Sequence, residues 1–461
     1  MGIEKTDELK LKKIILAYLI ASPFISGYLF FIKFEVAGVV IDLFRIGLAI
    51  CFLIGVRYFF SEKGDWYKFY GKGRLALGIW FIIILAVGTA HIVFQGTMPG
   101  GVSELVTVAE NLIFLICMIL FIQNDGDLWR FSVNVLKYTG VIVALISYFE
   151  LIFGFELPSS RFNEVEYYNG LSFHPATSIF ANENNLAAFL LVVSAILVWQ
   201  MLHESYKKRY CIKCIQLIIV IIPAVIADST IFKLGIIIIT VMACLILLIK
   251  NPVSKKNMGR CGIQVLIPVL ICYILKKFVR AAFIITSLNV LKQRALLSDV
   301  DLTKFLSGDS LVEQLQNTGM GTVTMRKNLF FYGVDAGRLH PFWGNGSNSF
   351  QYIFEHNAYY LEKTGGIVDP HNFLIEIFVQ YGAIAVTLFL IICVVAFFVS
   401  AKDAVYIKHQ SDEAYNMGFI VLMLVAFSIT TVMPSSFFKS TVYFIPLFLV
   451  LIGIDLRKRK I

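Results

Sequence analysis

Long apolar runs separated by polar connections dominate the chain. A helix of about 20 apolar residues is long enough to cross the hydrocarbon core of a bilayer. We count roughly twelve such runs. Because the apolar stretches are long and continuous rather than alternating, they predict an all-α, polytopic membrane protein with about twelve transmembrane helices. The expected spans are 14–32, 36–60, 75–94, 101–122, 131–153, 186–202, 212–228, 231–249, 263–280, 372–399, 416–433 and 441–455.

Composition agrees with this pattern. Of the 461 residues, 58% are hydrophobic and only 15% are charged, and the mean hydropathy is +0.77. A soluble core of this size cannot hide so much apolar surface, so a globular soluble protein is excluded. A charged leader, residues 1–13, precedes the first span without a small-residue cleavage site after it, which favours a retained helix over a signal peptide.

The net charge of +9 reports topology rather than a nucleic-acid partner. Lysine and arginine gather in connections that twelve crossings would place on one side of the membrane, and basic connections favour the cytoplasmic side. Both termini are then expected in the cytoplasm, including a basic tail at 456–461. The basic clusters lie at 5–13, 63–74, 207–213, 250–260 and 457–460.

Two connections on the opposite side are long, and they set the expected domain organisation. Nine spans in 14–280 include an outer loop at 154–185, a large extracytoplasmic loop follows at 281–371, and three spans occupy 372–455. The large loop has acidic and basic residues in similar number. Helix-like spacing at 305–315 and 352–361 predicts short helices lying on the membrane face. A loop of this length is usually functional or an added domain.

The stretch IVDPHNFLIEIFVQYG, residues 367–382, leads from the large loop into the tenth span. Asp369 and Asn372 are candidate helix caps, and Pro370 suits a first turn. Capping does not explain Glu376, because an acid inside a membrane helix is costly and usually faces a polar cavity or a partner.

Spacing extends this polar feature along the helix. Asn372, Glu376 and Gln380 recur every four residues and therefore share one face. His371 stands at the head of this stripe, at the predicted outer membrane surface. The segment predicts one wall of an active site, with a plain helix start as the alternative.

Upstream, HPFWGNGSNSF contains a GxG turn whose free amides would suit a phosphate. Arginine binds phosphate through a planar fork, so the arginines of the same outer region are candidate ligands. The alternative is a solvated loop with scattered charge. The candidate substrate-binding residues here are Gly344, Gly346, Arg294, Arg326 and Arg338.

The first outer loop carries further candidates. Asn182, Asn184 and Asn185 lie where the sixth span begins, and capping accounts for one asparagine but not three. Arg161 precedes them in the same loop. In the second span, Asp42 and Arg45 at positions i and i+3 predict a buried pair, with a helix-bundle lock as an equal interpretation.

No metal site is predicted. Two DxD triplets, at 125–127 and 299–301, lie far from other plausible ligands, and a three-residue pattern is almost non-specific. His340, His356 and His371 are too widely spaced to indicate a metal centre.

Taken together, these features resemble the O-antigen ligase and O-antigen polymerase family of bacterial membrane glycosyltransferases. In that family a GxG turn closes the large outer loop, an arginine lies upstream of it, and an HN…LE…G motif opens the next span. Arg326 matches the arginine, and Asn182-Glu183-Asn184 is a looser counterpart of the family's NPN. The HN…LE…G motif is matched by His371, Asn372, Leu374, Glu376 and Gly382.

One position departs from the family. A Ser-Arg often stands at the outer start of the span matching 231–249, where this chain has Thr230. Lys233 lies one turn later and supplies charge without the bidentate fork of arginine.

The resemblance implies a C-type glycosyltransferase fold in the bacterial cytoplasmic membrane and no cofactor. It also implies a glycan donor linked to undecaprenyl pyrophosphate, an acceptor glycan, and metal-independent inverting transfer at the outer face. Cations would stabilise the pyrophosphate leaving group. Arg326 is the first candidate, with Arg294, Arg338 or Lys233 beside it. His371 is the expected general base, and Glu376 is an alternative base or an orienting residue.

We interpret the chain as a polymerase of lipid-linked repeat units for an O-antigen or capsule polysaccharide of the cell envelope. Its expected partners are lipid-linked oligosaccharide, acceptor glycan, membrane lipid, a chain-length regulator and a flippase. A ligase acting on a different acceptor shares the same motifs and stays open. A transporter or flippase for lipid-linked glycans is the alternative of another class. Transporters usually carry their polar sites near the membrane midplane, with repeat symmetry, whereas the polar residues here gather at outer helix ends.

Overall fold

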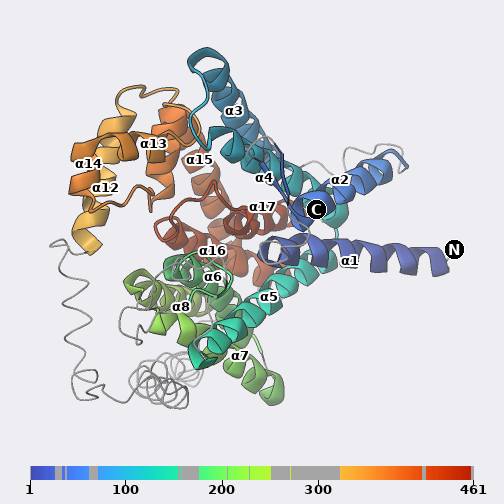
Figure 1. Ribbon diagram of the computed structural model, residues 1–461. Coiled ribbons are helices and arrows are strands. Elements are labelled where there is room, and N and C mark those ends of the chain that lie inside the picture. Colours follow the sequence, from blue (N-terminus) through green and yellow to red (C-terminus); the bar gives the residue numbers. More distant parts are fainter. Residues whose placement is uncertain are drawn as a thin grey trace.

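The computed structural model describes residues 2–25, 34–36, 39–61, 71–153, 157, 176–204, 206–227, 229–250, 270, 322–406 and 412–457. These residues are almost entirely helical (Figure 1). The helices are α1 (Gly2–Ile25), α2 (Leu43–Ser61), α3 (Lys72–Gln95), α4 (Gly101–Ile122), α5 (Gly126–Phe153), α6 (Glu183–Leu202), α7 (Lys207–Ile226), α8 (Thr230–Lys250), α12 (Thr322–Gly337), α13 (Ser349–His356), α14 (Ala358–Lys363), α15 (Phe373–Tyr406), α16 (Asp412–Thr430), the 3-10 helix η5 (Thr441–Tyr443) and α17 (Ile445–Arg457).

Within the described ranges, eight helices are long and apolar enough to cross a membrane: α2 to α8 and α15. This confirms an all-α, multi-pass membrane protein. The predicted spans 14–32, 416–433 and 441–455 also overlap helices, namely α1, α16 and α17, of which α16 and the η5–α17 segment have shorter apolar stretches. The span at 263–280 lies outside the described residues, so the count of twelve stays a prediction.

The second predicted span is wrong at its beginning. Residues 36–60 do not form one helix, because β1 (Phe34–Val36) pairs antiparallel with β2 (Val39–Ile41) before α2 begins at Leu43. Valine and isoleucine fit the extended backbone well, which favours this short hairpin over another helical turn.

The predicted Asp42–Arg45 ion pair is wrong as well. Asp42 Oδ1 accepts the backbone N–H of Arg45 at 2.9 Å and so caps α2. The Arg45 guanidinium instead pairs with Glu110 of α4. A cap at a helix start and an i, i+3 pair require the same spacing, so the sequence alone did not separate them.

The core is built around α6, which packs against α5, α7, α8 and α16 near the centre of the bundle (Figure 1). Its side chains are buried on every face, as expected for a helix that is apolar all round. The outer side of α15 differs, because Ile391 and Phe398 are exposed and face the lipid of a membrane-embedded bundle.

The short helices α12, α13 and α14 gather at one end of the molecule, beside the first turns of α15 (Figure 1). They share a small core with α15 that includes Leu329, Phe350, Phe354, Ile375 and Val379. The helix predicted at 352–361 corresponds to α13 and α14, which Asn357 separates by capping the second. The predicted helix at 305–315 lies outside the described residues.

A break in α15 joins this outer unit to the membrane helices. Gly382 has φ +78°, and Ala383 N–H donates to Pro341 O at 2.8 Å instead of to Val379 O within its own helix. The carbonyl groups released by the break are taken by the glycine turn: Asn345 N–H donates to Val379 O at 2.8 Å and Gly346 N–H donates to Gln380 O at 2.9 Å. The main chain of the turn therefore takes part in the hydrogen bonding of α15, an arrangement that we call the splice.

Trp80 of α3 contacts α15 on the C-terminal side of the break at Gly382. Its indole N–H donates to Ala385 O at 2.9 Å, and the side chain is almost fully buried. The ring stacks on Phe438 and packs against Phe373 and Phe389. This aromatic cluster ties α3 to α15 on both sides of Gly382.

The splice predicts that Gly344→Ala is strongly destabilising. Gly344 has φ +73°, and a Cβ atom there would lie 2.3 Å from the main chain of Gln380. The left-handed backbone costs an alanine about 1–2 kcal/mol, and the overlap adds about 1–3 kcal/mol because main chain must move. Thermal unfolding in detergent, followed by tryptophan fluorescence, measures the loss.

Gly366→Ala is the matched control. Gly366 also has a positive φ, +80°, but nothing lies within 4 Å of a Cβ atom at that position. Only the backbone cost of about 1–2 kcal/mol should appear. Equal losses in the two variants would contradict the splice.

Candidate active site

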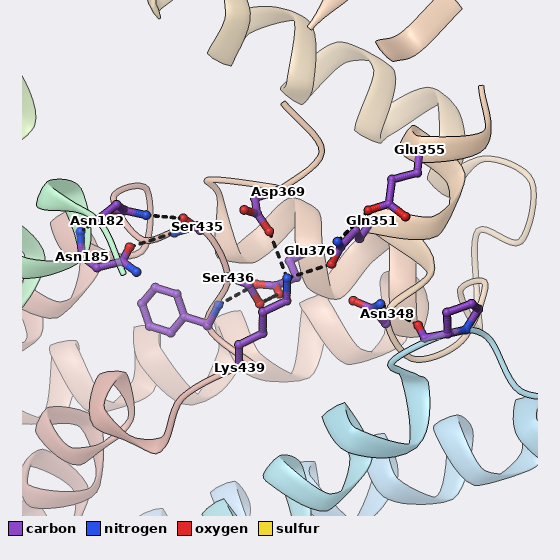
Figure 2. A network of polar contacts seen from close by, with 12 residues as sticks. Asn182, Asn185, Asn348, Gln351, Glu355, Asp369, Glu376, Ser435, Ser436 and Lys439 are labelled. Carbon is purple, nitrogen blue, oxygen red and sulfur yellow. Dashed lines mark hydrogen bonds and ion pairs between the residues drawn. The ribbon is translucent and has the colours of Figure 1, made fainter. Parts of the chain in front are cut away.

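The candidate residues converge on the loop that joins α16 to η5, residues 431–440, reading TVMPSSFFKS; we name it the connecting loop. Figure 2 shows this loop between the start of α6, the start of α15 and the outer helices. Segments that are far apart in the chain meet there. The site is therefore described from the contacts that each segment makes with this loop.

His371 lies directly before α15 and is half-buried. Its N–H donates to Ser435 O at 3.1 Å, and its Nδ1 atom lies 3.5 Å from Met433 O. The residue has φ +46°, a left-handed conformation that histidine adopts more readily than most residues. The connecting loop thus holds His371 through both its main chain and its ring.

Of the two candidate caps of α15, Asn372 caps the helix and Asp369 forms an ion pair instead. Asn372 Oδ1 accepts the N–H groups of Leu374 and Ile375, at 3.1 and 3.3 Å, so it caps α15, which was the alternative to its predicted role in binding substrate. The predicted cap at Asp369 is wrong, because that carboxylate pairs with Lys439 of the connecting loop at 3.0 Å. The helix begins at Phe373, too far along the chain for Asp369 to cap it.

Glu376 is buried, with a side chain that faces the connecting loop. One carboxylate oxygen accepts the hydroxyl of Ser436, and the other accepts the N–H of Phe437 at 3.0 Å. Both oxygens are thus occupied by the protein. In this structure Glu376 holds the same loop that accepts the main-chain N–H of His371 at Ser435 O.

The predicted stripe of Asn372, Glu376 and Gln380 shares one helix face, and each of its three side chains is paired within the part of the chain that the structure describes. Asn372 caps its own helix, Glu376 holds the connecting loop, and Gln380 Oε1 accepts the N–H of Asn348 beside the glycine turn. Buried polar groups are normally paired, and here the partners come from other segments of the chain. The stripe therefore joins α15 to the connecting loop and to the glycine turn.

Arg326 of α12 also reaches the connecting loop. Its Nη1 atom lies 3.5 Å from Val432 O, and the side chain is half-buried. Burial lowers the pKa of Arg326, while the nearby carboxylate of Glu183, at the start of α6, raises it. The structure therefore places a partly desolvated cation beside the same loop that holds His371.

The start of α6 completes this arrangement. Asn182 caps α6 by accepting the N–H of Asn185, and its amide donates to the hydroxyl of Ser435 at 2.7 Å (Figure 2). Asn185 Oδ1 accepts the N–H of Ser435 at 3.1 Å. Two of the three asparagines therefore position Ser435, and Asn184 is half-buried beside them.

The glycine turn differs from the predicted phosphate cradle. The N–H of Gly344 donates to His340 O at 2.8 Å, and those of Asn345 and Gly346 donate into α15. The amides are engaged because the broken helix offers carbonyl groups that need partners inside the protein. Gly344 and Gly346 shape the turn in this structure, and their amides do not face an open site.

The remaining predicted residues are dispersed. Arg338 is exposed at the end of α12, and Lys233 is half-buried on α8. Arg161 and Arg294 lie outside the described residues. Within the described ranges, no group of three His, Cys, Asp or Glu side chains is arranged to hold a metal ion.

Sequence reasoning missed Ser435, Ser436 and Lys439. Each lies in the connecting loop and contacts a predicted site residue or its neighbour: Asn182, Glu376 and Asp369 respectively. The available signal was a short polar run, PSSFFKS, between two apolar spans at the predicted outer surface. Such a run looks like an ordinary turn until tertiary contacts are known.

We predict that Asn182→Ala lowers activity as well as stability. Loss of the cap costs about 1 kcal/mol, and loss of the bond to Ser435 loosens the loop that holds His371. The matched control is Asn357→Ala, which removes only the cap of α14, where Asn357 accepts the N–H groups of Tyr359 and Tyr360. The initial rate of the catalysed reaction and the temperature of thermal unfolding, measured for both variants, separate the effect on activity from the effect on stability. Equal activities would contradict a role for Asn182 beyond capping.

Two comparisons with known proteins place the chain among its relatives. A family model described as O-antigen ligase matches residues 177–390. The chain is also 22% identical over 402 residues to the teichuronic acid biosynthesis protein TuaE of Bacillus subtilis (strain 168), an alignment that covers 86% of this chain and 74% of the relative. The matched range contains Asn182, Arg326, His371 and the break at Gly382. Residues 177–390 therefore belong to the O-antigen ligase family, and the protein is a multi-pass membrane enzyme of polysaccharide biosynthesis.

Proposed function

We propose that the protein is a polysaccharide polymerase. It transfers a glycan from an undecaprenyl-pyrophosphate-linked donor to a sugar hydroxyl at the outer face of the bacterial cytoplasmic membrane. The observation that carries this proposal is that Arg326 and His371 contact the same loop, at Val432 and at Met433 and Ser435 respectively. A cation and a base held by one loop are what this transfer needs.

The cation acts on the leaving group. When the bond between the anomeric carbon and the phosphate oxygen breaks, negative charge develops on the lipid pyrophosphate. A preorganised, partly desolvated guanidinium stabilises that charge more strongly than a solvated one. We therefore assign the pyrophosphate to the half-buried Arg326 rather than to the exposed Arg338. Lys233, Arg161 and Arg294 are candidates for further contacts with the donor.

The base acts on the acceptor. The imidazole of His371 takes the proton of the attacking hydroxyl while the oxygen forms its bond to the anomeric carbon. Attack from the side opposite the pyrophosphate inverts that centre. Glu376 assists by holding the loop at Ser436 and Phe437. Its oxygens are occupied, which favours a positioning role over that of an alternative base.

A ligase that moves the glycan to a different acceptor is the second candidate. The description of the matching family model, O-antigen ligase, favours it. The similarity to a protein named for the biosynthesis of a polymer, teichuronic acid, favours the polymerase. Both reactions use the same donor chemistry and differ in the acceptor.

Purified protein incubated with lipid-linked repeat units alone distinguishes these reactions. We expect a ladder of products on a gel, because donor and acceptor are then the same molecule. Product that forms only after a second acceptor is added would indicate the ligase. Absence of transfer with any acceptor, together with movement of the lipid across vesicles, would overturn both in favour of a transporter.

His371→Asn is the inactive control in that assay. Asparagine tolerates the left-handed backbone at this position but has no group that titrates near neutral pH. We expect a loss of activity of about 10²–10⁴-fold.

We predict that Arg326→Lys lowers kcat by about 10²-fold, because lysine retains the charge but not the bidentate fork. Arg338→Lys is the matched control, since it makes the same change at an exposed position at the end of the same helix. Its rate should stay within about twofold of the unmodified protein. An unchanged rate in Arg326→Lys would contradict the assignment of the pyrophosphate.

A further inference from the structure

Lys439 joins three segments at the centre of the polar network in Figure 2. Its ammonium lies 3.0 Å from Asp369 Oδ1, in the segment that precedes α15, and 2.8 Å from Gln351 Oε1, on α13. Lys439 itself belongs to the connecting loop. The side chains of Lys439 and Asp369 are 45% and 33% exposed, so this ion pair sits at the surface of the site rather than in the core.

The surroundings of Lys439 favour a fixed position. It interacts electrostatically with two buried carboxylates, Glu376 and Glu104. Glu104 accepts the hydroxyl of Tyr381 at 2.6 Å, and Glu376 accepts two groups from the connecting loop. The ammonium of Lys439 has two direct partners on different segments, the carboxylate of Asp369 and the amide oxygen of Gln351, and together they fix its position.

Asp369 lies two residues before His371, and this places the ion pair next to the proposed base. Two main-chain bonds attach the segment to the connecting loop, from His371 N–H to Ser435 O and from Phe373 N–H to Thr431 O. The ion pair between Asp369 and Lys439 fixes the end of the segment that these bonds do not reach. The bond to Ser435 O also holds His371 in its left-handed backbone conformation.

We propose that Lys439 is a positioning residue for the transfer reaction, which orients His371 by holding Asp369 against α13. This inference rests on the proposed function of His371. Lys439 does not touch the substrate in this scheme. The family model ends at residue 390, so this residue lies outside the matched range.

A double-mutant cycle tests this role. We expect Lys439→Met and Asp369→Asn each to lower kcat by about 10–100-fold, because a displacement of about 1 Å at a reacting group costs up to 10²-fold. The KM for the lipid-linked donor should stay within about threefold. The double variant should be no slower than the slower single variant, because both changes remove the same interaction. Lys439→Arg should retain more activity than Lys439→Met.

Lys363→Met is the matched control. Lys363 forms an exposed pair with Glu362 on α14 at 2.8 Å, in the same outer unit. Its loss should leave kcat within about twofold, as is usual for exposed pairs.

A different pattern would overturn the proposal. If Lys439 binds the donor phosphate directly, Lys439→Met raises KM, Asp369→Asn has no comparable effect, and the two losses add. If the pair serves stability alone, both variants unfold at lower temperature and the folded fraction retains its kcat.

Hydrogen–deuterium exchange separates this inference from the proposed function. In Lys439→Met, but not in Lys363→Met, amides of residues 367–373 should exchange faster, because His371 and Phe373 donate to the connecting loop. Unchanged exchange would overturn the positioning role whatever the activity. Faster exchange together with an unmodified protein that transfers no glycan would overturn the proposed function and, with it, the role of Lys439 in the reaction.

Discussion

Polar groups inside a membrane protein must be paired by the protein itself. Because α15 breaks at Gly382, main-chain groups near the break need partners outside their own helix. The break releases the carbonyls of Val379 and Gln380, which the glycine turn then takes. That pairing seats α12, α13 and α14 on the membrane helices and brings Arg326 to the site. An unbroken helix would leave the turn without partners.

The connecting loop supplies partners to a second buried polar group, the side chain of Glu376. Glu376 is a buried carboxylate, and the loop supplies the hydroxyl of Ser436 and the N–H of Phe437 to it. Once fixed in this way, the loop offers its own carbonyls and Ser435 to His371, Arg326 and Asn182. An acid that looked catalytic in the sequence thus organises residues from four segments. The chemistry we propose depends on this rigidity.

Much of the fold and part of the site followed from the sequence. Apolar runs predicted the helices because a bilayer demands continuous apolar length. Asn372 was expected in a substrate-facing stripe, and its role as a cap was only the alternative interpretation. The second span failed at its start because a β-branched stretch can be helix or strand. Asp42 and Arg45 failed as a pair because the true partner, Glu110, is 65 residues from Arg45 in the chain. The sequence did not indicate that the amides of the glycine turn pair with α15, because those partners are distant in the chain.

The sequence by itself determined the membrane class, the helical architecture, and the identity of His371, Arg326 and Glu376 as residues that need an explanation, since cost in a bilayer and residue chemistry are properties of local sequence. Tertiary structure decided what each of them faces. Lys439 and Ser435 lie in a short polar run that looks like an ordinary turn, because their partners Asp369, Asn182 and Asn185 are brought to them by the fold. A contact between distant segments carries no fixed spacing, and so only the folded chain reveals it.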